Sequence, residues 1–468
     1  MSKVQTMVNP AVVVLLIAGC SEKPAPPAAA FAVDSRTAER AEDARPLVRE
    51  FSIDVPNAYF DLSRTFTIRT GGSTPPVQAR AYGYMGVALY EALVSGMPAN
   101  RSIASQLNGI EALPQAKEIP YRWPLVANAA MAEVMRGLWG DKTDRAAQNI
   151  ADLDALEARF VSQYGAGVPP GLTKLSIDFG HAVGAAVFAA SRHDGEHESY
   201  LTNFPSTYVP PIGPGFWVPT APGQVALQPF WATTIRSLVL ATPDACDPGP
   251  PLAYSEQPDS PFYGEAKLDY DISKTLTSEQ LIIARYWADG AGTFSGPGHS
   301  MGIVAEVLTQ HHRTLADAAE AYARAGIADA DALTAIWSAK FRYNLIRPVT
   351  YIRRVIDQAW NTVLPTPPFP EYVSAHSGQS AASLATLEAL FGTNVPFVDH
   401  AHDADGFAPR SFDRIFAAAE EAGMSRVYAG IHFKSGNLKG RALGECVAAK
   451  VDALNWYRFT TTPATRSP

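Results

Sequence analysis

Two basic side chains are the first of several polar residues whose types and spacing suggest a binding or catalytic site. Lys340 and Arg347 are seven positions apart, and Pro348 follows directly. Because seven residues make about two helical turns, both cations are expected on one helix face. The proline disfavours helix at Arg347 and so places it near a helix end. Two cations on one face could bind a tetrahedral oxyanion, whereas the plainer alternative is a solvated charged face.

A second segment joins a hydroxyl and an imidazole at the expected start of a helix. Ser374, Ala375 and His376 follow a proline-rich approach and precede a helical run. A helix start offers free backbone N–H groups and the positive end of its dipole to an anion. Ser374 could add a hydroxyl donor, and His376 would lie at the rim, placed for general acid–base work. An ordinary serine N-cap is the alternative.

A third segment supplies another cation and another histidine. Arg426 and His432 are six positions apart, which on an unbroken helix would point them in different directions. Gly430 lies between them and allows a helix end or turn that could bring the two side chains together. The alternative is a helix-end arginine and a histidine satisfied by its neighbours.

Together the three segments resemble the K-x6-RP, PSGH and SR-x5-H motifs of one enzyme superfamily. It joins vanadium-dependent haloperoxidases with type-2 phosphatidic-acid phosphatases and bacterial acid phosphatases. The order and the internal spacings of the motifs match between Lys340 and His432. Looser similarity to the bacterial haloperoxidase-like branch lies at Trp287-Ala-Asp289-Gly.

This resemblance implies a role for each matched residue. His376 would be the acid–base group, and His432 the axial vanadium ligand, or in a phosphatase the phosphorylated nucleophile. The same pocket would serve vanadate and phosphate, because vanadate resembles the five-coordinate state of phosphoryl transfer. The oxygens of the anion would be bound by Lys340, Arg347, Arg426, Ser374 and the backbone N–H of Ala375.

The chain departs from the family pattern at three positions. Val373 replaces the usual proline and Ala375 the usual glycine. The family often carries an aspartate four residues after the histidine, where it orients the imidazole, but Gly436 occupies that place here. A missing carboxylate would lower the basicity of His432 and loosen its tautomer preference. This departure weakens the phosphatase interpretation more, because there the histidine must act as nucleophile.

Three features favour a haloperoxidase over a phosphatase. The chain is far longer than a minimal acid phosphatase, and it lacks the spanning helices of lipid phosphatases. Trp337 and Phe369 match the chlorinating branch, where such aromatics line the halide side, although core packing is their alternative role. We therefore predict a vanadate-dependent haloperoxidase that oxidises halide with hydrogen peroxide and serves a small organic acceptor. The alternative is an acid phosphatase working through phosphohistidine, and the resemblance also allows a homodimer.

The segments that hold these residues are helical by pattern. Apolar residues recur at helical spacing, and no sustained run of alternating strand-type sequence occurs. This pattern favours all-α helical bundles over an α/β fold, and the resemblance implies a two-bundle architecture with long Pro/Gly-rich loops. Helices are expected at residues 77–97, 123–139, 144–164, 175–192, 278–289, 301–325, 330–346, 380–391, 412–427 and 440–457.

Length and composition fit such a division. The 468 residues are 47% hydrophobic, enough for a large core. A net charge of −8 without a basic block argues against a nucleic-acid partner. We predict an N-terminal helical half at 46–200, a Pro/Gly-rich connection at 201–265 and a C-terminal catalytic bundle at 266–460.

The first residues are predicted to direct export. An apolar run after Lys3 ends in Leu16-Ile-Ala-Gly-Cys20, which resembles the lipobox of bacterial lipoproteins. Residues 1–19 are thus a predicted signal peptide, Cys20 a lipidation site and residues 20–45 a tether. We expect a periplasmic or outer-membrane lipoprotein that touches the membrane only through its anchor; an ordinary secretory signal is the alternative. In an exported protein Cys246 and Cys446 could pair, but the sequence does not give their separation.

Two other functions deserve comparison. Gly298-His-Ser300-Met-Gly302 fits the G-x-S-x-G motif of serine esterases, but it lacks the hydrophobic strand that must precede it. A non-catalytic lipoprotein that only captures an oxyanion is the second. The two histidines argue against it, since binding alone needs only cations and N–H donors.

Overall fold

The protein is helical throughout its described range. The computed structural model describes residues 46–459 except 141–144 and 291, and these described residues belong to one compact unit. The only strands in this range are β1 (Phe397–Asp399) and β2 (Arg410–Phe412), which pair antiparallel. The predicted all-α class is therefore confirmed. The expectations for residues 1–45, including the lipidation of Cys20, lie outside the described residues.

The helices fall into an earlier and a later group along the chain. The earlier α-helices are α2 (Asp54–Arg69), α3 (Pro75–Leu93), α4 (Trp123–Trp139), α5 (Ala146–Gly165), α6 (Pro170–Ser191) and α7 (Trp231–Thr234). The later ones are α8 (Pro261–Thr275), α9 (Ser278–Tyr286), α10 (Ser295–Gln310), α11 (Leu315–Tyr343), α12 (Pro348–Val355), α13 (Ala375–Phe391), α14 (Ile415–Tyr428) and α15 (Lys434–Asp452). Short 3₁₀ turns are η1 (Val48–Glu50), η2 (Val94–Gly96), η3 (Ala104–Gln106), η4 (Ser199–Leu201) and η5 (Asp403–Asp405).

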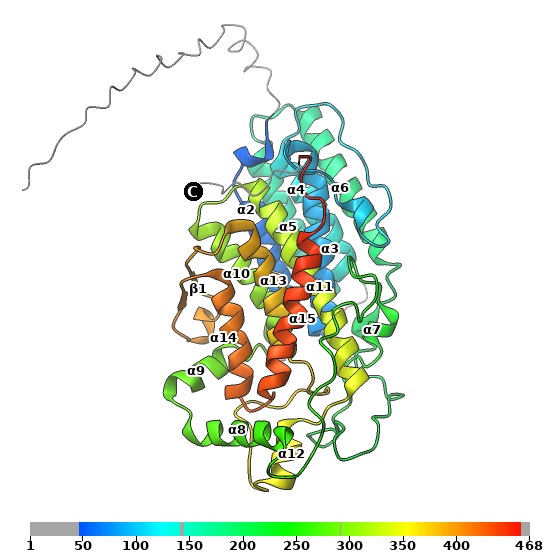
Figure 1. Ribbon diagram of the computed structural model, residues 1–468. Helices are drawn as coiled ribbons and strands as arrows, with labels where there is room; N and C mark the ends of the chain where they lie inside the picture. The colour runs from blue at the N-terminus through cyan, green and yellow to red at the C-terminus, as the bar shows by residue number, and fades with distance from the viewer. Residues whose placement is uncertain (1–45, 141–144, 291, 460–468) are drawn as a thin grey trace, which may run out of the picture. The chain divides into compact units, whose positions relative to one another are not determined.

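Helix α11 is the central element of the packing. It is buried along most of its length and packs against α3 on one side and α13 on another (Figure 1). Its many alanines let the neighbouring helices approach closely. Thr314 and Asp317 form a capping box that begins the helix, and Asn344 ends it in a left-handed conformation with φ 48°. The end of α11 carries Lys340, and the start of α13 follows Ser374, so these two helices hold parts of the first and second predicted catalytic segments.

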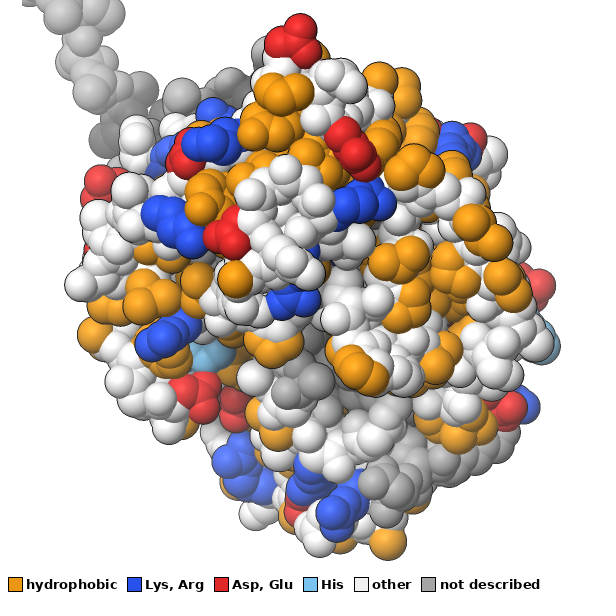
Figure 2. Space-filling view, turned by 90° about the horizontal axis from the view of Figure 1, so that it is seen from below, with side chains coloured by type: hydrophobic (Ala, Val, Ile, Leu, Met, Phe, Trp, Pro, Cys, Tyr) orange, Lys and Arg blue, Asp and Glu red, His pale blue; other side chains and the backbone are white. Residues whose placement is uncertain are grey.

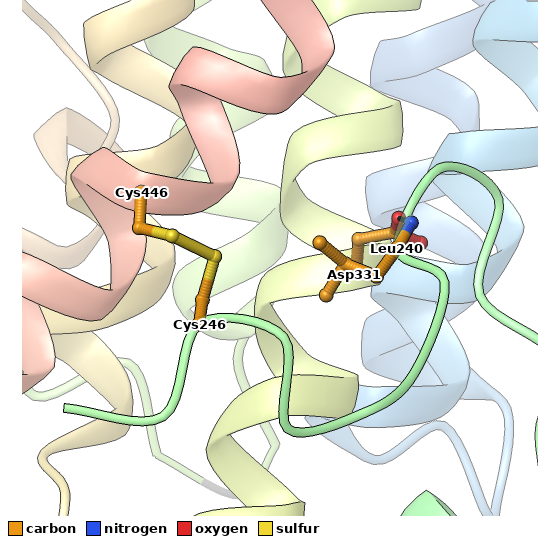
Figure 3. Close-up of a disulfide and its surroundings, with 4 residues drawn as sticks. All are labelled: Leu240, Cys246, Asp331 and Cys446. Carbon is orange, nitrogen blue, oxygen red and sulfur yellow. Dashed lines mark hydrogen bonds between the residues drawn. A yellow bond between two sulfur atoms is a disulfide. The ribbon is translucent and has the colours of Figure 1, made fainter. Parts of the chain in front are cut away.

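The long proline-rich segment is tied to this core at two points (Figure 3). Both carboxylate oxygens of Asp331 on α11 accept backbone N–H groups of Leu238, Val239 and Leu240, at 2.7 to 2.8 Å. A few residues later Cys246 forms a disulfide with Cys446 on α15, with a Cα–Cα distance of 5.8 Å. The pairing that the sequence left open is thus present, and the loop is fixed where it crosses α11 and α15.

Some helix boundaries differ from the expected ones. The predicted helices at 301–325 and 330–346 are wrong in their division, because the chain turns at residues 311–314 and α11 then runs unbroken to Tyr343. The capping box at Thr314 explains the break, since it supplies the partners that a new helix start needs. Helices α2, α7, α8 and α12 were not predicted from the sequence. Helix α8 begins at Pro261, inside the predicted connection, where Ser260 caps it.

The surface at the lower end of the bundle is chemically mixed. Viewed from below, basic, acidic and hydrophobic side chains lie side by side on this face (Figure 2). Within the described ranges, no helix is long and apolar enough to cross a membrane. The division into two halves joined at 201–265 stays a prediction.

Candidate oxyanion and acid–base site

The three predicted segments meet at neighbouring helix ends. Lys340 lies in the last turn of α11, Arg347 directly precedes α12, and the Ser374 side chain caps the start of α13. Arg426 lies in the last turn of α14, and His432 follows in the turn before α15. None of these five residues is more than 2% exposed. Helix ends carry partial charges and free backbone groups, which were expected from the sequence to help bind an anion.

Lys340 and Arg347 come together, but from the ends of two different helices and not from one helix face as predicted. They do not share a helix face, because α11 ends at Tyr343 and the chain turns at Asn344 before α12. The expected position of Arg347 at a helix end is correct. Both cations lie over the ring of Phe369, with Lys340 Nζ 4.8 Å and Arg347 Cζ 5.0 Å from its centre.

The turn expected at Gly430 is present. Helix α14 ends at Tyr428, and Gly430 has φ 72°, which favours glycine. The chain then reverses, and Ile431 donates its N–H to the carbonyl of Arg426 at 3.2 Å. His432 is brought to Arg347, whose Nη1 donates to His432 Nε2 at 3.1 Å. The first and third motifs are therefore joined directly.

A carboxylate does orient His432, but it comes from another element. His432 Nδ1 donates to Glu371 Oε1 at 2.8 Å, and the Phe433 N–H reaches the same oxygen at 3.1 Å. A Cβ on Gly436 would overlap Glu371 Oε1 and lie 2.8 Å from Oε2. Gly436 thus leaves the space that Glu371 fills. The expected loss of an orienting carboxylate is wrong, since Glu371 takes the place of the family's aspartate.

These contacts fix the protonation of His432. Its Nδ1 carries the hydrogen that Glu371 accepts, and its Nε2 keeps the lone pair that Arg347 approaches. Burial, followed by the nearby cations Arg347, Lys340 and Arg426, holds the pKa of His432 well below its usual value. The ring is therefore neutral, and its Nε2 lone pair, which accepts from Arg347 in this structure, could act as a ligand or nucleophile once Arg347 turns to a bound anion.

The pocket holds an excess of positive charge. Burial lowers the pKa of Lys340 well below its usual value, and the charge of Arg347 adds to this. Burial also lowers the pKa of Arg347 to about 9 and that of Arg426 to about 10, partly offset by Glu371 and Asp289 respectively. A bound anion would relieve this repulsion, so the charge pattern favours an oxyanion.

His376 lies at the rim, as the sequence suggested. Its side chain is 21% exposed, while the anion-facing residues are buried. Burial and the charge of Arg426 lower the pKa of His376 to about 4 against the opposing effect of Asp289. Asp289 Oδ2 lies 3.5 Å from His376 Nε2. The histidine is therefore neutral near pH 7 and able to accept a proton.

The G-x-S-x-G segment does not form a nucleophile elbow. Ser300 lies inside α10, is 2% exposed and follows no strand. A serine esterase needs its nucleophile on a sharp strand-to-helix turn. The helical setting therefore excludes this arrangement at Ser300.

Comparison with known proteins supplies the family. The family model "VCPO second helical-bundle domain" matches residues 320–458, which include all three motifs. The crystal structure of a bacterial vanadium-dependent iodoperoxidase has 30% sequence identity and a TM-score of 0.77, over 88% of this chain and 99% of that one. The chain belongs to the vanadium-dependent haloperoxidase superfamily.

More distant members of the superfamily share the fold. A holo-type bacterial vanadium-dependent chloroperoxidase has 16% identity and a TM-score of 0.59, over 88% of this chain and 96% of that one. Its apo-type structure gives 16% identity and a TM-score of 0.60, over 81% of this chain and 93% of that one. No curated protein sequence matches the chain.

The donor set fits the vanadate that the superfamily is named for. Arg347 Nη2 is buried without a hydrogen-bond partner among the described residues. An oxygen of a bound anion would satisfy this donor. His432 Nε2 presents a lone pair, and its Nδ1–H is anchored by a carboxylate, the arrangement typical of metal-bound histidines. Ser374 accepts the Ser377 N–H at 3.5 Å, so its role as N-cap is also real.

Two parts of this site were not predicted from the sequence. Glu371 stands in the second motif's proline-rich approach, and the glycine at 436 was the signal that a carboxylate must come from elsewhere. The second part surrounds Asp289, whose oxygens contact His299, His376 and His402. The motif Trp287-Ala-Asp289-Gly was noticed, but nothing in the sequence joined it to those histidines.

Proposed function

We propose that this protein is a vanadate-dependent haloperoxidase that oxidises halide with hydrogen peroxide. The supporting observation is the buried cationic pocket, in which His432 Nε2 keeps its lone pair because Glu371 holds the Nδ1–H. The net reaction converts halide, hydrogen peroxide and one proton into hypohalous acid and water. Vanadate, when bound, would supply a Lewis-acidic centre that activates the peroxide without changing its own oxidation state.

The chain's own residues bind and neutralise the anion. Lys340, Arg347 and Arg426 place three cations around one site in a buried environment, where charge interactions are strong. Lys340 is positioned by the carbonyls of Pro370 and Glu371, which accept from its Nζ at 2.9 and 3.0 Å. Its orientation is therefore set before an anion arrives, which lowers the reorganisation that binding requires.

His376 is the general acid–base group of the proposed reaction. It is neutral at pH 7 and can take a proton from incoming peroxide. It can return that proton to the departing water, so its protonation state is restored at the end of the cycle. Asp289, 3.5 Å away, favours the protonated form that exists in between.

Trp337 and Phe369 form the proposed halide side. Their rings lie 5.2 Å apart, and Trp337 is held by a hydrogen bond from its Nε1 to the carbonyl of Leu227 at 3.2 Å. Phe369 covers Lys340 and Arg347, so a halide reaching the anion would pass a largely apolar surface. We propose iodide as the first halide to test, because the relative with 30% identity is described as an iodoperoxidase.

A phosphatase acting through His432 is the second candidate. The carboxylate of Glu371 favours it more than the sequence did, because a nucleophilic histidine needs its Nδ1–H held in the same way. Phosphate and vanadate would compete for the same cations.

Parallel assays separate the two functions. Phosphate-free protein is given vanadate, hydrogen peroxide and either iodide or bromide, and halogenation of a phenolic dye is followed. The same protein without vanadate is tested on p-nitrophenyl phosphate. We expect vanadate-dependent halogenation that His432→Ala abolishes and that His193→Ala, at an exposed histidine, leaves unchanged. Phosphate-ester turnover that vanadate only inhibits would instead establish the phosphatase.

A further inference from the structure

A second cluster of metal-ligating side chains lies beside the oxyanion pocket. Asp289, His299 and His402 are at most 5% exposed, and one ligand atom from each lies within 4.8 Å of the others. His299 Nδ1 is 3.1 Å from both Asp289 oxygens, and His402 Nε2 is 3.2 Å from Asp289 Oδ1. Zinc bonds of about 2.0–2.1 Å in a tetrahedron require ligand atoms about 3.3 Å apart. The distances from Asp289 to His299 and to His402 are close to this, and all three ligand atoms lie within 4.8 Å of one another.

The outer nitrogen of each histidine is held by its own carboxylate. His299 Nε2 is 2.8 Å from Asp399 Oδ2, and His402 Nδ1 is 2.8 Å from Asp405 Oδ2. Asp399 is fixed in turn, because its Oδ1 accepts the Ala401 N–H at 2.9 Å. Metal-bound histidines almost always donate their second N–H in this way, which fixes the ring and the tautomer. Asp289, Asp399 and Asp405 bring three carboxylates to the two rings, and this negative charge would offset a cation that replaces the proton on His299 Nδ1.

Aromatic rings enclose the cluster. The ring of Trp287 stacks on His299 with centroids 4.3 Å apart, and Phe294 lies 4.9 Å from His402. The Tyr286 ring is also 4.9 Å from His402. An apolar shell of this kind limits water access and strengthens the binding of a cation by the ligands within it.

A cavity borders the aromatic shell around the cluster. This cavity of ≈ 220 Å³ is lined by Ala401, Arg64 and the carboxylates of Asp61 and Glu306, among others. Arg64 lies over the Phe294 ring at 4.3 Å, so the cavity borders the aromatic shell. The carboxylates in the cavity would attract a hydrated cation toward the shell.

We propose that Asp289, His299 and His402 bind one divalent transition-metal ion, best matched by zinc, separate from the oxyanion pocket. Two imidazoles and one carboxylate are ligands that zinc prefers, and a fourth position is left for water. The ion joins the segment after α9, helix α10 and the loop after β1. Asp289 Oδ1 would contact the ion, while Oδ2 stays directed at His376 Nε2, 3.5 Å away. The proposal does not depend on which reaction the oxyanion pocket performs.

Two matched histidine–aspartate pairs in one loop provide the test. His402–Asp405 and His400–Asp403 have the same spacing in sequence and the same 2.8 Å contact, but His402 is buried in the cluster and His400 is exposed. The full chain is stripped with a chelator and titrated with Zn²⁺ and Co²⁺ in the absence of vanadate. Metal content, affinity and the visible absorption of four-coordinate Co²⁺ are measured.

The wild type is expected to bind one equivalent with the four-coordinate Co²⁺ spectrum. His402→Gln should lose binding, and Asp405→Asn should weaken it by about 10–100-fold, as loss of an outer carboxylate does. His400→Gln and Asp403→Asn should bind as the wild type does. Circular dichroism checks that each variant folds, and Asp405 is exposed enough for its variant to do so. A wild type that binds no metal, or equal affinities in the two variant pairs, would overturn the proposal and leave a purely hydrogen-bonded cluster.

Discussion

At the scale of single residues, the site depends on an exchange between two positions: the carboxylate that the family often carries at position 436 is supplied here from position 371. The carboxylate that orients His432 comes from Glu371, and Gly436 leaves the space for it. Each residue is explained by the other, although they are far apart in the sequence. The meeting of Lys340, Arg347, Ser374, Arg426 and His432 in one site could be predicted, because their three motifs together resemble those of a known superfamily. The exchange could not, because it depends on which helix ends meet.

Changing Glu371 tests this exchange. Glu371→Gln keeps the shape but removes the charge that holds the His432 Nδ1–H, so vanadate affinity should fall by about 10–100-fold. Gly436→Ala should do the same, because its Cβ would displace the Glu371 carboxylate. Gly171→Ala is the control, since nothing lies within 4 Å of a Cβ at that position. Binding is measured by titration calorimetry, and wild-type affinity in both Glu371→Gln and Gly436→Ala would refute the positioning role.

At the scale of elements, helix ends and one central helix position the chemistry. The hydrophobic periodicity predicted most of the helices, including α4 with its bounds, because burial imposes that pattern. It did not predict where α10 ends and α11 begins, since the alanine-rich sequence is helical in character on both sides of residues 311–314. Nor did it predict that Lys340 and Arg347 would lie on different helices, because the left-handed turn at Asn344 leaves no clear signal.

Asp331 on α11 is expected to hold the proline-rich segment in place. Asp331→Ala leaves the N–H groups of Leu238, Val239 and Leu240 without their acceptor. Each unsatisfied buried donor costs about 1–3 kcal/mol, although water will satisfy some of them. We expect the free energy of unfolding to fall by about 1–3 kcal/mol in urea denaturation. An unchanged unfolding midpoint would show that the segment is held without this carboxylate.

Asp329, on the same helix, gives a pH-dependent prediction. Burial, only partly offset by Ser383, raises its pKa well above the usual value. Between the unfolded pKa of about 3.9 and the higher folded one, the folded state binds more protons, so the wild type loses stability as pH rises. Asp329→Asn is neutral throughout. The stability of this variant relative to wild type should therefore increase from pH 4 to pH 8 in urea titrations, and a pH-independent difference would contradict the raised pKa.

At the scale of the whole molecule, the disulfide links distant parts of the chain. Cys246 and Cys446 are 200 residues apart, and their bond joins the proline-rich segment to α15, whose start adjoins His432. Cysteine counting in the sequence left this pairing open, because no pattern of residues gives the distance between two points of a folded chain. The all-α fold, in contrast, followed from composition and periodicity alone.

Removing the disulfide should destabilise the protein without dismantling the site. Replacing Cys246 and Cys446 by serine lifts a long-range constraint on the unfolded chain, which is typically worth about 2–5 kcal/mol. The midpoint of thermal unfolding should fall in the double variant, and reductant should lower it in wild type but not in the variant. Equal midpoints for the two proteins under oxidising conditions would contradict this expectation.

The most direct test of the central claim is a vanadate titration of iodide oxidation. Phosphate-free protein at a known concentration receives increasing vanadate at fixed hydrogen peroxide and iodide, and the initial rate is recorded. We expect no rate above the protein-free background without vanadate, a rise that saturates at one vanadate per chain, and suppression by added phosphate that more vanadate reverses. A rate that is independent of vanadate, or that phosphate does not affect, would show that the cationic pocket around His432 does not carry the reaction.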